Sequence, residues 1–182
     1  MPGEKAITLI LGGARSGKSR LAQKLASRYP SVVFVATATA VDEEMRRKIE
    51  RHKADRPSKW VTVEEPVSVD AVVREWTPRA GVMLVDCLTL YTANLLSAAH
   101  NNAEDALARA QSLLEALRKA EAPVVLVSND VGSGIVPAYP TGRAFRDLLG
   151  EINQQVAAIA DNVAFMVAGL PLMLKGKLEA AQ

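Results

Sequence analysis

Short hydrophobic runs recur along the chain, and longer amphipathic stretches separate them. The runs are nearly continuous and rich in β-branched residues, which is typical of strands buried on both faces of a parallel sheet. They occupy residues 6–11, 31–38, 60–63, 81–86, 123–128 and 163–169. Between them the pattern predicts helices over residues 18–28, 42–54, 88–97, 103–120 and 141–161. This alternation predicts an α/β fold with a doubly wound, mainly parallel sheet, right-handed connections and helices on both faces.

The last predicted helix has the clearest apolar face. Its hydrophobic residues recur at steps of three and four, and Thr141 stands where it would cap the first turn. The members of the face are Phe145, Leu148, Leu149, Ile152, Val156 and Ile159. We interpret this face as core. The segments 132–142 and 169–176, rich in glycine and proline, are predicted to be loops within one domain spanning residues 1–182.

Composition narrows the class of protein. The chain has 182 residues, 49% of them hydrophobic, which is enough to bury a core. Its net charge of only +2 argues against a general nucleic-acid binder. A single cysteine, Cys87, rules out an intramolecular disulfide and favours a cytoplasmic location, and we interpret Cys87 as a small core residue. We expect neither a signal peptide nor a membrane span.

The segment GGARSGKS at residues 12–19 has the spacing of a phosphate-binding P-loop and stands between a predicted strand and a predicted helix. Glycines let backbone N–H groups turn onto phosphate oxygens, Lys18 reaches the β and γ phosphates, and the Ser19 hydroxyl coordinates Mg²⁺. The alternative is a glycine-rich turn with an incidental Lys-Ser, which the flanking elements disfavour. The predicted fold is therefore P-loop NTPase-like. The predicted nucleotide contacts are Gly12, Gly13, Ala14, Arg15, Ser16, Gly17, Lys18 and Ser19.

Asp86 ends the hydrophobic run at residues 81–86. A carboxylate in this position holds Mg²⁺ in P-loop enzymes, although an acid after a strand is also a common helix cap. Behind a P-loop the metal role is favoured, so we predict that Ser19 and Asp86 hold Mg²⁺.

The segment at residues 42–57 is strongly charged and contains His52. By itself the segment reads as a solvated helix face. The functional interpretation is that its basic residues bind phosphates while His52, with an unperturbed pKa of about 6.5, offers a neutral imidazole as nucleophile. Those basic residues are Arg47, Arg51, Lys53 and Arg56.

Several blocks, in order, resemble the bifunctional adenosylcobinamide kinase and adenosylcobinamide-phosphate guanylyltransferase family of cobalamin biosynthesis. The resemblance covers almost the whole chain. The blocks are GGARSGKS (12–19), VATATAVDEEM (35–45), RHKADRP (51–57), LVDCLTLYTANLL (84–96), VSNDVGSGIVP (127–137), GRAFRDLLGEINQQVA (142–157) and AGLPLMLK (168–175). Asp130 departs from the family's pattern, which commonly has glutamate there.

The resemblance implies two reactions. In the first, ATP or GTP phosphorylates adenosylcobinamide; in the second, His52 takes GMP from GTP, releasing pyrophosphate, and passes it to the phosphorylated product, giving adenosylcobinamide-GDP. Further nucleotide contacts are implied at Ala36, Thr37, Ala38, Lys53, Ala54, Asp55, Arg56 and Glu64. A homotrimer is also implied.

Some questions stay open at this level. The base of the kinase step is one of the carboxylates Asp42, Glu43, Glu44, Glu64 and Asp130. The alternatives to a bifunctional enzyme are a P-loop small-molecule kinase with only one of the two activities and a nucleotide-dependent switch protein.

Overall fold

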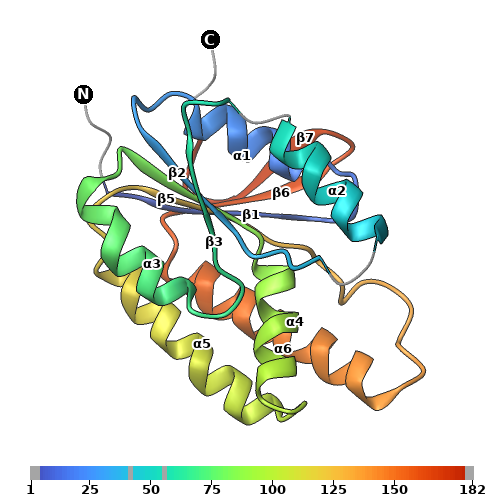
Figure 1. The fold of residues 1–182 in the computed structure, drawn as a ribbon. Helices are drawn as coiled ribbons and strands as arrows, with labels where there is room; N and C mark the ends of the chain where they lie inside the picture. Colours follow the sequence, from blue (N-terminus) through green and yellow to red (C-terminus); the bar gives the residue numbers. More distant parts are fainter. Residues whose placement is uncertain (1–4, 41–42, 55–56, 179–182) are drawn as a thin grey trace.

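The computed structural model describes residues 5–40, 43–54 and 57–178. Within them a seven-stranded sheet runs in the order β3-β2-β4-β5-β1-β6-β7 (Figure 1). The first six strands along the chain are parallel, and β7 pairs with β6 in the antiparallel sense. The strands are β1 (Ile7–Gly12), β2 (Val32–Ala36), β3 (Val61–Glu64), β4 (Val82–Asp86), β5 (Val124–Val127), β6 (Asn162–Val167) and β7 (Leu170–Lys175).

Helices cover both faces of the sheet. One face carries α1 (Lys18–Ala26) and α2 (Glu43–Ala54) (Figure 1). The other carries α3 (Val69–Trp76), α4 (Leu88–Ala98), α5 (Ala103–Arg118) and α6 (Pro140–Ile159), with a 3₁₀ turn at Thr77–Arg79 after α3. Connections toward the β3 edge use the first face and connections toward the β7 edge use the second, as expected when all crossovers share one hand. The predicted doubly wound, mainly parallel α/β fold is confirmed.

Two hydrophobic cores form because successive strand residues point to opposite faces. Leu9, Val85 and Leu126 belong to the core under α3 to α6, whereas Ile10 and Leu84 belong to the core under α1. The predicted core face of α6 is confirmed, because its four central members are buried and the two outer ones pack against them. The prediction that every strand is buried on both faces is wrong for β3, which is a largely exposed edge strand.

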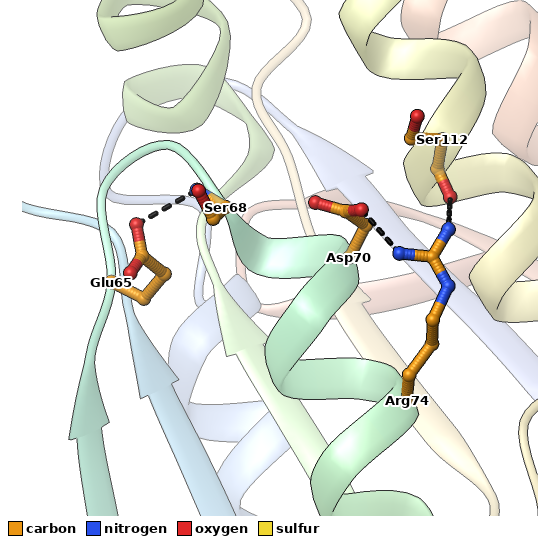
Figure 2. A network of polar contacts seen from close by, with 5 residues as sticks. All are labelled: Glu65, Ser68, Asp70, Arg74 and Ser112. Carbon is orange, nitrogen blue, oxygen red and sulfur yellow. Dashed lines mark hydrogen bonds and ion pairs between the residues drawn. The ribbon is translucent and has the colours of Figure 1, made fainter.

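The sequence pattern did not predict α3. The carboxylate Oε1 of Glu65 accepts the N–H groups of Val67 and Ser68, at 2.9 and 2.7 Å, and so fixes the turn that leads into this helix. Further along, Arg74 pairs with Asp70 and donates to the carbonyl of Ser112 in α5 at 3.1 Å (Figure 2). With only eight residues, α3 is too short for a clear helical period, and these tertiary contacts stabilise it.

Two further expectations are wrong. Residues 169–176, predicted to be a loop, contain β7; Ala168 and Gly169, both with positive φ, form a tight turn that returns the chain beside β6. Thr141 does not cap α6, because the helix begins one residue earlier at Pro140, with Tyr139 in the cap position. Proline suits the first helical position, where its missing N–H has no partner to lose.

Candidate functional site

The loop between β1 and α1 has the backbone of a phosphate cradle. Gly12 has φ 148°, and a Cβ there would lie 2.6 Å from the carbonyl of Met166, so only glycine fits. Gly17, with φ 99°, is the N-cap of α1 and therefore brings no capping side chain. The first turn of α1 also lacks acidic residues. Its N–H groups therefore keep their attraction for an anion.

Lys18 is the first residue of α1, and its ammonium folds back over the loop. Nζ donates to the carbonyl of Gly13 at 2.5 Å and lies 3.4 Å from Oγ of Ser16. The side chain is 8% exposed. Burial lowers the pKa of Lys18, while the nearby Cys87 and Asp86 oppose that shift. A buried cation above a ring of N–H groups is complementary to phosphate.

A cleft of about 1450 Å³ opens above this loop. Its lining combines the phosphate loop, the carboxyl ends of four strands, one side of α2, the start of α4 and the β6–β7 turn. The residues are Ala14, Arg15, Ser16, Gly17, Lys18, Ser19, Arg20, Phe34, Ala36, Ala38, Glu43, Arg47, Ile49, Glu64, Asp86, Cys87, Thr89, Leu90, Val127, Asn129, Ala168 and Gly169. Ligands of open α/β sheets bind at this edge, outside the carboxyl ends of the strands.

Ser19 and Asp86, the two predicted metal ligands, both line the cleft. The alternative role of Asp86 as a helix cap does not hold, because Cys87 occupies the cap position of α4. A hydroxyl and a carboxylate are oxygen donors of the kind that Mg²⁺ prefers, with phosphate oxygens and water completing its shell. The residues present therefore fit the metal. In the described part of the chain no cluster of three or more acidic, histidine or cysteine residues offers a denser site.

Of the three residues predicted from the turn after β2, Ala36 and Ala38 line the cleft and Thr37 does not. Thr37 is fully buried, and its hydroxyl both donates to the carbonyl and accepts from the N–H of Cys87, each at 2.8 Å. Its carbonyl accepts from the side-chain amide of Asn94, which also donates to the carbonyl of Pro66. Thr37 therefore fastens β2 to β4.

The other side of the cleft belongs to α2 and β3. Glu43, Arg47 and Ile49 of α2 face Glu64 at the end of β3, and Lys53 pairs with Glu64 at an adjoining pocket of about 450 Å³. His52 follows Ile49 by three residues, about one helical turn. The side chains of Glu44, Arg51, His52 and Ala54, and residues Asp42, Asp55 and Arg56 altogether, lie outside what the structure describes.

Asp130, a candidate base, is occupied within its own loop. Its carboxylate accepts the N–H of Gly132 at 3.1 Å and the hydroxyl of Ser133 at 2.8 Å. Glu43 and Glu64 are the candidates that line the cleft. Sequence reasoning passed over Asn129 and Gly169, whose only local signals were a polar residue after a strand and a glycine in a loop. Gly169 donates its N–H to the carbonyl of Ser16 at 3.0 Å and so supports the phosphate loop.

Comparisons with known proteins agree over almost the whole chain. A family model described as cobinamide kinase / cobinamide phosphate guanyltransferase matches residues 8–174. The bifunctional adenosylcobalamin biosynthesis protein CobP of Pseudomonas aeruginosa is 44% identical over 170 residues, covering 93% of this chain and 97% of the relative. The bifunctional adenosylcobalamin biosynthesis protein CobU of Salmonella typhimurium is 39% identical over 178 residues, covering 92% of this chain and 98% of the relative. CobU of Escherichia coli matches with the same identity and coverage.

A solved structure supports the fold. A prototypical ATPase from the type III secretion system of pathogenic bacteria superposes with a TM-score of 0.59 and 14% sequence identity. The match covers 93% of this chain and 57% of that ATPase chain. At this identity the likeness concerns the fold alone, and it agrees with the predicted P-loop NTPase-like architecture.

Proposed function

This chain belongs to the cobinamide kinase / cobinamide phosphate guanyltransferase family, and from that premise we propose that it carries out both reactions in adenosylcobalamin biosynthesis. It phosphorylates adenosylcobinamide with ATP or GTP. It then transfers GMP from GTP to the phosphorylated product, giving adenosylcobinamide-GDP and pyrophosphate. The observation that carries the proposal is a P-loop cleft that also reaches the helix bearing His52. Residues 1–182 act in it as a single domain.

In the kinase step, residues 12–19 hold the triphosphate through backbone N–H groups at the start of α1. The ammonium of Lys18 exchanges its contact with the Gly13 carbonyl for phosphate oxygens and stabilises the charge that develops on them. The acceptor is the terminal hydroxyl of the aminopropanol arm of adenosylcobinamide. Glu43 and Glu64, which line the cleft, are the carboxylates that we propose as candidates to receive the hydroxyl proton.

Ser19 and Asp86 are the residues that would hold Mg²⁺, which supplies charge neutralisation between the β and γ phosphates. Their placement beside Lys18 on the cleft wall supports this assignment. Ala36 and Ala38 at the end of β2 provide a small, apolar wall for the nucleotide, and Lys53 and Glu64 lie where α2 meets the sheet.

In the guanylyl step, an imidazole nitrogen of His52 bonds to the α phosphorus of GTP as the bond to the β,γ-pyrophosphate breaks. The phosphate of adenosylcobinamide phosphate then displaces the histidine and takes the GMP group. Arg47, on the same helix, lines the cleft, is 78% exposed and pairs with Glu43 at 3.5 Å; we assign it to the phosphates, for which it would exchange this exposed pair. The proximity of α2 to the phosphate loop across one cleft supports this step.

We also propose a homo-oligomer, a trimer by family likeness, with a cytoplasmic location. Assembly is supported by the apolar side chains that are exposed at the β7 edge. The exposed fractions of Val167, Leu170 and Leu172 are 53, 71 and 58%. The pairing of Val167 with Leu170 places these two side chains on one face. An exposed apolar edge strand is a site for association. Among the described residues, no helix has the length and apolar character needed to cross a membrane.

The kinase reaction is tested with adenosylcobinamide and GTP labelled at the γ phosphate. We expect label in the corrinoid, followed by adenosylcobinamide-GDP when unlabelled GTP is added. Product that stops at the phosphate would identify a dedicated kinase. Nucleotide hydrolysis that leaves the corrinoid unlabelled and does not respond to it would instead support the switch protein.

A further inference from the structure

Asn129 follows β5. This strand lies between β1, which leads into the phosphate loop, and β4, which ends in Asp86. Val127, the last residue of β5, pairs with Ile10 on one side and with Asp86 on the other. Two residues later Asn129 lines the cleft that also contains Lys18 and Asp86. The chain here stays beside the loop, because the N–H of the next residue donates to the carbonyl of Gly12 at 3.2 Å.

Two helices fix the main chain of Asn129. Its N–H donates to Oγ1 of Thr89, in the first turn of α4, at 2.9 Å. Its carbonyl accepts from the side-chain amide of Asn153, in α6, at 3.1 Å. The amide of Asn129 itself has no hydrogen bond to any residue that the structure describes. An anchored main chain that presents an unbonded amide to a cleft is a preorganised polar group.

We propose that the side-chain N–H₂ of Asn129 donates a hydrogen bond to the terminal phosphate during phosphoryl transfer, a role that rests on the proposed kinase function. In that step the substrate hydroxyl oxygen bonds to the γ phosphorus and loses its proton. The bond to the bridging oxygen breaks, and the nucleoside diphosphate leaves with the electron pair. Asn129 forms no covalent bond; it stabilises the charge on the transferred group.

The chemistry favours a donor at this place. Charge in the transition state spreads over the three outer oxygens of the transferred group, and fixed donors aimed at them lower the barrier. The charged residues at this end of the cleft are Lys18, Arg15 and Arg20, with the carboxylate of Asp86. A neutral amide adds a donor without attracting a further counter-charge, and Asn129 follows β5, which lies between the strand that ends in Asp86 and the strand of the phosphate loop.

Two variants test the role of the amide. Asn129→Asp keeps the size but replaces the donor with a negatively charged oxygen, whereas Asn129→Ala removes the amide without adding a charge. We expect each to lower kcat for γ-phosphate transfer by about 10²-fold, with little change in the KM for GTP. Labelling of the chain by GTP carrying the label at the α phosphate should stay near the native rate, because a different bond breaks in that reaction.

Asn102→Ala is the matched control, since Asn102 lies at the start of α5 and does not line the cleft. It should keep both rates. Native phosphoryl transfer by Asn129→Asp or by Asn129→Ala overturns the proposal, because both variants lack the donor. Equal loss of both reactions also overturns it. If the unaltered chain transfers no γ label, the proposed kinase function is wrong. That result is independent of the Asn129 variants, so the two failures can be told apart.

Discussion

Lys18 joins burial and positive charge at one residue. The residue is 8% exposed, its ammonium donates to the carbonyl of Gly13 in the phosphate loop, and Asp86 is a nearby opposing charge. Such an arrangement is costly for an isolated cation and favourable once phosphate arrives, since the ligand then supplies the missing negative charge. The Lys18 side chain therefore contributes more to the free energy of nucleotide binding than to the stability of the folded chain without nucleotide.

Lys18→Met should separate these two effects. We expect phosphoryl transfer to fall by about 10²- to 10³-fold, because a donor to the transition state is lost. The free energy of unfolding without nucleotide should not fall, because the variant no longer buries a charge. Steady-state rates and urea unfolding measure the two quantities. Retention of near-native activity by this variant would contradict the role given to Lys18.

Cys87 offers a pH-dependent probe of the same cleft, and it is the only cysteine in the sequence. Burial raises the pKa of its thiol above that of a free cysteine, and the Asp86 carboxylate adds to the shift. The reactive thiolate therefore forms at higher pH in the folded chain than in the unfolded one. The rate of alkylation should rise with an inflection at higher pH in the folded chain than in the urea-unfolded chain, and GTP should slow it in the folded chain. An inflection at the same pH in both states would show that the thiol is not shielded.

Among single residues, sequence reasoning located part of the cleft lining where the residues are contiguous, and it missed features that depend on distant contacts. Lys18 and Ser19, which line the cleft, belong to one unbroken segment. The burial of Thr37, a residue that the sequence suggested as a nucleotide contact, could not be predicted because it results from bonds to Cys87, fifty positions away. Asn129 acquires its place only when β5 inserts between β1 and β4.

At the scale of elements, the central strands and the long helices follow directly from the hydrophobic pattern. The pattern missed α3, which is a short helix, and β7, and both depend on their neighbours. The helix α3 depends on the turn that Glu65 fixes before it and on the bond from Arg74 to α5 (Figure 2). The strand β7 depends on a turn in which Ala168 has φ 51°. Alanine rarely adopts a positive φ, so the sequence did not predict this turn.

The start of α5 gives a local stability test. The side chain of Asn102 accepts the N–H groups of Glu104 and Asp105, at 3.0 and 3.3 Å, and so caps the helix. Asn102→Ala should lower the free energy of unfolding by about 1 kcal/mol while leaving catalysis unchanged. Asn102→Asp, which keeps an acceptor oxygen, should recover most of the loss. Chemical denaturation of the three chains measures the difference, and equal stability of all three would show that the cap contributes nothing.

At the scale of the whole molecule, the sheet has two different edges. The β3 edge meets α2 through the pair of Lys53 and Glu64 and borders the cleft. The β7 edge lies at the other end of the sheet and exposes apolar side chains. The cleft also touches the β6–β7 turn through Ala168 and Gly169, whereas the exposed apolar side chains that we assign to subunit contact lie along the β7 edge.

Leu172→Glu tests that assignment. A charge on the exposed β7 surface should weaken association, because contact between copies would bury it without a partner. Sedimentation should show the native chain as an oligomer and the variant at lower mass. Lys177→Glu is the control, because it adds a glutamate at an exposed position beyond β7. A control such as Leu107→Glu in α5 would be unsuitable, because Leu107 packs against the core. A native chain that sediments as a monomer would contradict the oligomer.

The measurement closest to the central claim follows the α phosphate of GTP. The native chain, incubated with GTP labelled there, should become covalently labelled and should then pass the label to adenosylcobinamide phosphate. The His52→Ala chain should take up no label while still transferring γ phosphate to adenosylcobinamide. Equal labelling of the two chains, or protein-bound label that adenosylcobinamide phosphate does not remove, would contradict guanylyl transfer through His52.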